Sequence, residues 1–252
     1  MSKSRTPTLF TPLAALSTLL MVQSATRAGL ILDFREGQTG NVASHFDGDT
    51  AGDTAGPFTD PTTGVTATLT TQSVSSPITG PVELNTTGNG LGINVVDVGR
   101  EDSGGFDVDE NWTFSWDVPT YFDGIDMVGV DTDEYFIVQS DDWRNMSLTP
   151  GSSNVSFDAS TGTFKLYGAE IYDKFDLFDL SGNALLPVNA GSDVVISFGT
   201  TAEGKSGSIQ TMSWTAVPEP SSLALCALAL AALGLYARRQ RATMQGATTK
   251  PE

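Results

Sequence analysis

The sequence predicts an all-β domain over residues 29–216, an antiparallel β-sandwich of jelly-roll-like type. Two observations predict this fold class. Short apolar or alternating stretches recur between Gly, Pro, Asn, Asp and Ser residues, which is the pattern of strands joined by turns. Helical periodicity is hard to find in the same region. The 188 residues of this segment suit one sandwich domain with a sizeable core.

The expected strands follow from the alternation. In the stretch 112–116 (WTFSW), Trp112, Phe114 and Trp116 share one face, and we expect that face to belong to the core. The stretch 37–64 is rich in Gly, Asp and Thr and is expected to form a long loop with little fixed structure. The expected strands are 30–34, 65–70, 91–98, 112–118, 125–130, 135–139, 154–157, 163–167, 175–180, 194–198 and 208–215.

Residues 1–28 have the order of a signal peptide, which would form an N-terminal signal helix. Lys3 and Arg5 are followed by 14 mostly apolar residues, 9–22, and then by Thr26-Arg27-Ala28. This apolar run is too short for an ordinary spanning helix but has the length of a signal-peptide core. We therefore expect export of the chain and cleavage before Gly29.

The C-terminal segment has three parts in a fixed order. Two prolines in Val217-Pro218-Glu219-Pro220 disfavour helix and leave an extended strip. The apolar run 223–237 has 15 residues, which as a single transmembrane helix would reach about 22 Å. A basic cluster that would stay cytoplasmic follows, formed by Arg238, Arg239 and Arg241. Residues 242–252 would then be a short cytoplasmic tail.

This order of motif, apolar segment and basic cluster over residues 217–241 resembles the PEP-CTERM sorting domain of Gram-negative bacteria, which is also filed as an ice-binding-protein C-terminal domain. The resemblance implies exosortase as the processing partner, which would recognise Pro218, Glu219 and Pro220. It also implies anchoring at the inner membrane, later placement at the cell surface or outside it, and a link to exopolysaccharide and biofilm matrix. The ice-binding label is no activity, because the motif occurs with many unrelated domains.

The charge of the middle domain limits the partners that it can bind, and its lack of cysteine limits how it can be stabilised. Residues 29–216 hold six Lys or Arg against 28 Asp or Glu, a net charge of −22. Such a surface repels nucleic acid and anionic lipid headgroups, so we expect no nucleic-acid partner. Cys226 is the only cysteine and lies in the apolar run. The domain therefore has no internal disulfide, and its stability must come from packing.

Catalytic motifs are hard to find, so we expect a protein that is not an enzyme. His45 is the only histidine and lies in the Gly/Asp-rich stretch without a nucleophile elbow nearby. There is no P-loop and no dinucleotide-binding glycine pattern. A carboxylate pair for glycoside hydrolysis cannot be singled out among so many acidic residues.

Calcium is the one cofactor that the loops suggest, because it takes hard oxygen ligands from loop carboxylates. Neither candidate loop completes the EF-hand pattern, since Ala51 stands where the first loop needs Asp or Asn. A solvated acidic loop is the alternative in both places. The candidate ligands are Asp47, Asp49 and Asp53 in the first loop and Asp131, Asp133 and Glu134 in the second.

Trp143 is the candidate sugar-binding residue, because the charged neighbours Asp141, Asp142 and Arg144 suggest a surface position. The sequence thus predicts an exported, exosortase-processed and non-enzymatic protein of the cell surface or extracellular matrix. One alternative is a lectin-like module that binds exopolysaccharide. Another is a secreted polysaccharide hydrolase or lyase.

Overall fold

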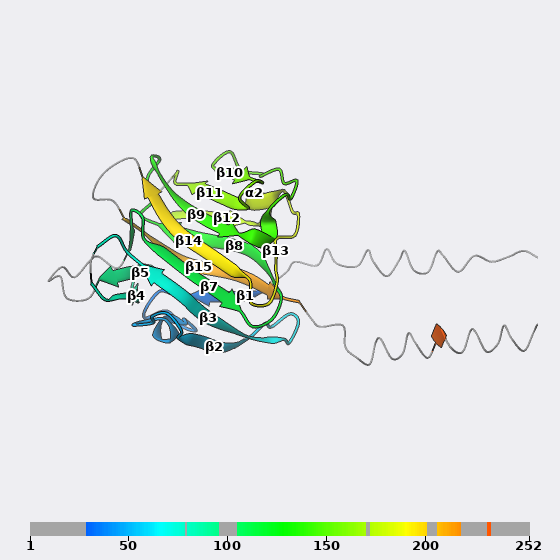
Figure 1. The fold of residues 1–252 in the computed structure, drawn as a ribbon, viewed down its shortest axis with the longest axis horizontal. Helices are drawn as coiled ribbons and strands as arrows, with labels where there is room; N and C mark the ends of the chain where they lie inside the picture. The colour runs from blue at the N-terminus through cyan, green and yellow to red at the C-terminus, as the bar shows by residue number, and fades with distance from the viewer. Residues whose placement is uncertain are drawn as a thin grey trace, which may run out of the picture. The chain divides into compact units, whose positions relative to one another are not determined.

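Two antiparallel β-sheets make up most of the described part of the chain in the computed structural model, which describes residues 29–78, 80–95, 105–169, 172–200, 206–217 and 231–232 (Figure 1). One sheet has 8 strands and the other 7. The prediction of an antiparallel all-β fold is confirmed. The jelly-roll connectivity stays a prediction.

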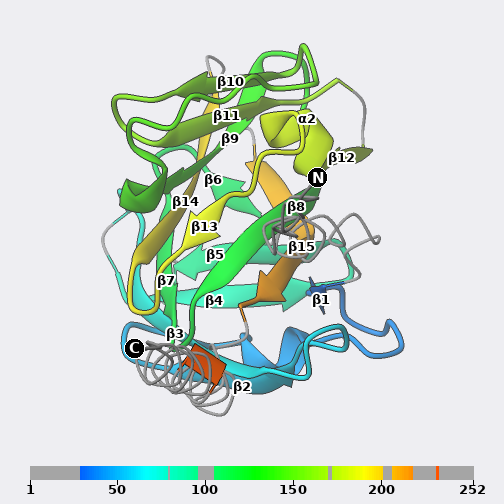
Figure 2. The ribbon, with the colours of Figure 1, turned by 90° about the vertical axis from the view of Figure 1, so that its right-hand side faces the viewer.

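The eight-stranded sheet is organised around its last strand. The order is β12-β8-β15-β5-β4, with β13 paired to β8 and with β1 and β6 paired to β15. Figure 2 shows β15 lying beside β8, its neighbour over almost its whole length. The strands are β1 (Leu30–Asp33), β4 (Val82–Thr87), β5 (Gly90–Val95), β6 (Phe106–Asp107), β8 (Thr120–Val128), β12 (Tyr172–Asp176), β13 (Pro187–Val188) and β15 (Ser206–Ala216).

The seven-stranded sheet has the order β10-β11-β9-β14-β7-β3-β2. Its strands are β2 (Thr54–Thr59), β3 (Thr66–Ser75), β7 (Asn111–Trp116), β9 (Glu134–Ser140), β10 (Val155–Asp158), β11 (Thr163–Tyr167) and β14 (Asp193–Thr200). Three short helical segments connect strands within the described ranges: η1 (Ala43–His45), η2 (Asp141–Trp143) and α2 (Leu177–Ser181).

Aromatic side chains join the two sheets face to face. Trp112, Phe114 and Trp116 of β7 are at most 1 % exposed, so the prediction that they belong to the core is confirmed. The ring of Trp214, on β15 of the opposite sheet, lies 5.8 Å from that of Phe114 and 5.5 Å from that of Trp116. It also lies 4.8 Å from Phe122 on β8. Trp214 is therefore shared by strands of both layers.

The expected strand 175–180 is wrong in its second half. Strand β12 ends at Asp176, and helix α2 begins at the next residue. The Asp176 carboxylate accepts hydrogen bonds from the amides of Phe178 (2.8 Å) and Asp179 (3.1 Å), which caps the helix start. Gly182 ends the helix in a left-handed conformation with φ 63°.

The stretch 37–64 is more ordered than we expected. It contains η1 and the whole of β2. Phe46 is fully buried, and its ring stacks on that of Phe58 at 6.2 Å. Two aromatic residues thus fix this stretch to the core, although its overall composition is typical of a loop.

Replacing Trp214 tests the shared aromatic contact. We expect Trp214→Ala to lower the free energy of unfolding by about 3–5 kcal/mol, because it leaves a large cavity between the sheets. Urea denaturation monitored by far-ultraviolet circular dichroism measures the change. Phe178→Ala is the matched control, since this ring is 52 % exposed, and should cost well under half as much. Equal losses in the two variants would contradict the packing role.

Candidate functional site

The predicted sorting segment follows the end of β15 in the sequence. A buried carboxylate holds the backbone at this end of the strand. The chain divides into two compact units, 1–216 and 217–252. Asp60 is 1 % exposed, and its Oδ2 accepts a hydrogen bond from the amide of Ala216 at 2.8 Å. Its Oδ1 accepts from the amides of Thr62 and Thr63 at 2.7 and 3.2 Å. The last residue of β15 is therefore held by a turn 156 positions earlier in the chain.

The predicted mature N-terminus lies beside the same strand end. Leu30 of β1 pairs with Trp214 of β15. Gly29, the first residue after the predicted cleavage point, lies so close to β15 that a Cβ atom there would be 2.7 Å from Thr215 Oγ1 and would overlap the Trp214 carbonyl. Only glycine fits at position 29, because the backbone of β15 lies so close. The predicted cleavage point before Gly29 thus lies beside the end of β15, and the predicted sorting motif follows that end in the sequence.

The residues of the two predicted membrane-directed segments lie outside the described residues. They are the signal peptide 1–28, the motif residues Pro218, Glu219 and Pro220, the basic residues Arg238, Arg239 and Arg241, and the tail 242–252. Val217 is described and is half-buried. In the described part of the chain, no helix has both the length and the apolar character needed to cross a membrane.

The first predicted calcium loop does not gather its carboxylates. Among the described residues, no three His, Cys, Asp or Glu side chains come close enough to hold a metal ion. Asp53 Oδ2 instead accepts hydrogen bonds from Thr50 N (2.8 Å) and Thr50 Oγ1 (3.0 Å). Asp47 Oδ1 accepts one from the amide of Thr86 at 3.4 Å. Asp53 thus closes its own loop, and Asp47 joins the loop to β4.

The second predicted calcium loop is a turn closed by a buried glutamate. Glu134 is 1 % exposed, and its Oε2 accepts a hydrogen bond from the amide of Asp131 at 2.7 Å. Asp133 is exposed. A second turn has the same pattern, since Glu110 Oε2 accepts from the amide of Asp107 at 2.8 Å. The repeated sequence Asp-x-Asp-Glu therefore closes a turn before β7 and before β9.

Trp143 is not on the surface, so the prediction of a sugar-binding role for it is wrong. Its side chain is fully buried, and its Nε1 donates a hydrogen bond to the carbonyl of Pro187 at 2.9 Å. The indole packs between Phe122 (5.8 Å between centroids) and Phe164 (5.4 Å). The charged neighbours stay outside while the short helix η2 turns the indole inward.

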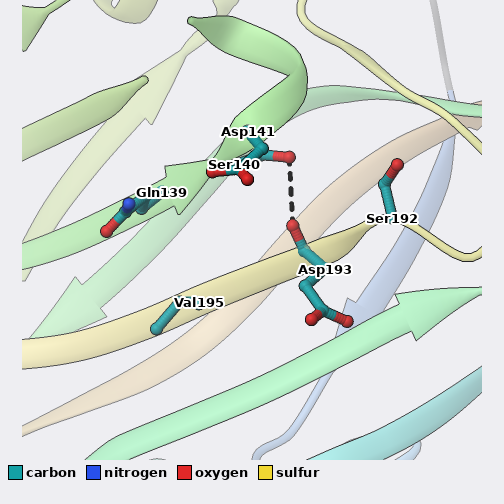
Figure 3. A pocket seen from close by; sticks show the side chains of 6 residues that line it. All are labelled: Gln139, Ser140, Asp141, Ser192, Asp193 and Val195. Carbon is teal, nitrogen blue, oxygen red and sulfur yellow. Dashed lines mark hydrogen bonds between the residues drawn. The ribbon is translucent and has the colours of Figure 1, made fainter. Parts of the chain in front are cut away.

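A polar hollow of about 310 Å³ opens where β9 ends and β14 begins. Figure 3 shows the six residues that line it, which are Gln139, Ser140, Asp141, Ser192, Asp193 and Val195. Ser140 Oγ donates a hydrogen bond to the carbonyl of Asp193 at 3.0 Å, which fixes the two strands at this point. Asp141 forms an ion pair with Arg144 at 2.9 Å. Sequence reasoning missed this hollow, because its lining comes from strands about 50 positions apart.

Asp49 is a carboxyl group in an environment that disfavours its charged form. Its Oδ2 is buried and has no hydrogen-bond partner among the described residues. Burial and the nearby Asp53 carboxylate raise the pKa of Asp49 to about 6, while His45 opposes the shift. The charge that Asp49 carries at neutral pH therefore lowers the stability of the fold.

Removing the Asp60 carboxylate should loosen the end of β15. We expect Asp60→Ala to cost about 1–3 kcal/mol of unfolding free energy, because three backbone amides lose their acceptor. Limited proteolysis should then cut the chain faster near Ala216. Asp142→Ala is the control, since this carboxylate accepts hydrogen bonds from the backbone and side-chain amides of exposed Asn189, at 2.8 and 2.7 Å, and not from β15. If Asp60→Ala were cut near Ala216 no faster than the unmodified chain, the result would contradict the role of Asp60 in holding the end of β15.

The raised pKa of Asp49 predicts a pH-dependent gain in stability on its removal. The folded pKa of about 6 lies above the unfolded value, so stability falls as the pH rises through this window, from about 4 to about 6. Asp49→Asn should raise the free energy of unfolding at pH 7 by on the order of 1 kcal/mol after solvent screening, and change it little at pH 4. Urea denaturation at the two pH values measures this.

Asp158→Asn provides the opposite sign as a control. Hydrogen bonds from the Ser160 hydroxyl and amide lower the pKa of Asp158, so its carboxylate stabilises the fold at neutral pH and that contribution is lost as the pH falls. This variant should be destabilised at pH 7 and less so in acid. Equal pH profiles for the two variants would refute the assignment for Asp49.

Comparison with known proteins identifies one segment of the chain. Residues 216–241 match the family model of the PEP-CTERM protein-sorting motif. No curated protein and no solved structure matches the chain. The match begins at Ala216, whose amide donates a hydrogen bond to Asp60, and it ends at Arg241 in the predicted basic cluster. The chain therefore carries, directly after the last strand of its sandwich, a PEP-CTERM protein-sorting motif.

Proposed function

We propose that this chain is an exported protein of the cell surface or extracellular matrix, processed by exosortase, with no enzymatic activity of its own. A PEP-CTERM motif implies a protein directed to exosortase and on to the cell surface. The observation that carries the proposal is the match over residues 216–241, which continues from β15 without a linker.

The two ends of the chain have complementary parts in this proposal. Residues 1–28 act as the signal peptide that starts export. The apolar run 223–237 then holds the chain at the inner membrane as one short helix, with Arg238 and its basic neighbours on the cytoplasmic side. Pro218-Glu219-Pro220, between the sandwich and the anchor in the sequence, is the part that exosortase recognises.

The sandwich itself is the part that remains outside the cell after processing. Its net charge of −22 keeps it soluble and away from anionic lipid and nucleic acid. A binding role is the second candidate function, and the hollow between β9 and β14 favours it, because its lining offers hydroxyl, amide and carboxylate groups together. A carbohydrate polymer of the matrix is the ligand class that such a lining suits.

Substitution of the central motif residue tests the sorting proposal. In cells that contain exosortase, Glu219→Ala should leave the full-length chain in the membrane fraction, whereas the unmodified chain is converted to a shorter, released form. Pulse-chase labelling with fractionation follows both species. Glu36→Ala, the same change at an exposed site on the sandwich, should be processed normally. Release of Glu219→Ala at the normal rate would refute the proposal.

A further inference from the structure

Ala216 belongs both to the folded sandwich and to the sorting motif. It is the last residue of β15, where it pairs with Thr120 of β8 and its side chain is buried. It is also the first residue of the match to the PEP-CTERM protein-sorting motif. One residue therefore has two uses, as the end of a strand and as the start of a segment that exosortase is proposed to recognise.

Two side-chain hydrogen bonds hold this end of β15. The last residues of most domains fray unless a contact holds them. Here the buried Asp60 carboxylate accepts a hydrogen bond from the amide of Ala216 at 2.8 Å. One position earlier, the Thr215 hydroxyl donates a hydrogen bond to Asp123 at 2.5 Å. The backbone just before the motif is thus fixed to the sandwich and is not a free linker.

The motif follows the held residue too closely for both uses at once. Only Val217, which is half-buried, separates Ala216 from Pro218 in the sequence, and one extended residue spans at most about 3.6 Å. Proteins that bind an extended peptide do so largely through its backbone hydrogen-bonding groups. An amide that donates to Asp60 is not available to an enzyme. The backbone before Pro218 can therefore lie in the sheet or in the groove of exosortase, but not in both.

We infer that the end of β15 has to open before exosortase processes the chain, and that Asp60 sets how often it opens. Asp60 is a positioning residue, because it acts by holding Ala216 in the strand. When opening and closing are fast compared with processing, the rate of processing is proportional to the open fraction. The sandwich thereby slows its own release. This inference rests on the proposed function, since it takes exosortase to be the processing enzyme.

Asp60→Asn is the variant that acts on Ala216 alone. Its one carboxamide oxygen can still accept from the amides of Thr62 and Thr63, as Oδ1 of Asp60 does. The new NH2 group then takes the place of Oδ2 opposite the Ala216 amide, and two donors form no hydrogen bond. The turn keeps its acceptor while the hold on Ala216 is lost.

Asp142→Asn is the matched control for this change. The Asp142 carboxylate also accepts hydrogen bonds from amides through both oxygens, but these amides belong to Asn189 and not to β15. Hydrogen exchange of the full chain in detergent measures the opening itself. Asp60→Asn should raise the exchange rate in peptides that cover the end of β15 and leave β9 and β14 unchanged, whereas Asp142→Asn should leave the end of β15 unchanged.

An insertion frees the motif without changing the sandwich. The residues Gly-Ser-Thr-Ala, placed between Ala216 and Val217, leave β15 as it is and repeat Thr215-Ala216 directly before Val217. The motif thus keeps its own preceding residues and gains about 14 Å of free backbone. The same insertion between Thr39 and Gly40, in an exposed turn, is the control.

Processing is measured by pulse-chase labelling of the full chain in cells that contain exosortase. We expect the half-life of the full-length membrane form to fall roughly tenfold in Asp60→Asn, which is the effect of losing one hydrogen bond to a buried charged acceptor. The insertion after Ala216 should shorten the half-life by at least as much. Adding Asp60→Asn to this insertion should then change nothing, because the motif no longer needs β15 to open. Both controls should keep the half-life of the unmodified chain.

Three results would overturn the inference. Unchanged half-lives in Asp60→Asn and in the insertion variant would mean that the closed strand does not limit processing. Slower processing of Asp60→Asn would mean that exosortase binds the closed end of the sandwich. A further gain from Asp60→Asn in the insertion variant would mean that Asp60 acts through general stability. Failure of the sorting proposal is seen separately, as release of Glu219→Ala at the normal rate.

Discussion

The structure depends most on the packing of one strand, β15, and on the indole of Trp214 at its centre. The sandwich has no disulfide, because Cys226 lies in the C-terminal apolar run. β15 pairs with β8 on one side and with β1, β5 and β6 on the other. Trp214 brings the same strand into ring contact with Phe114 and Trp116 of the opposite sheet. Sheet continuity and sheet-to-sheet packing therefore rest on the same eleven residues.

The position of β15 in the chain gives this dependence a consequence for folding. Among the described strands it is the last in the sequence, yet it occupies the interior of its sheet, so β1 and β8 lack their partner until it has been made. Its last residue is fixed by Asp60, and the sorting motif match begins at that residue. The sandwich is thus completed only when the chain has been made up to the residue at which the sorting motif match begins.

Local patterns predicted the strands, but not the contacts that depend on distant segments. Trp112, Phe114 and Trp116 could be placed in the core because alternation along one strand is a local property. Trp143 could not, because its charged neighbours are local whereas Phe122 and Pro187, which receive the indole, are not. Helix α2 was missed because the carboxylate of Asp176 caps it within an apolar and acidic stretch that also alternates like a strand.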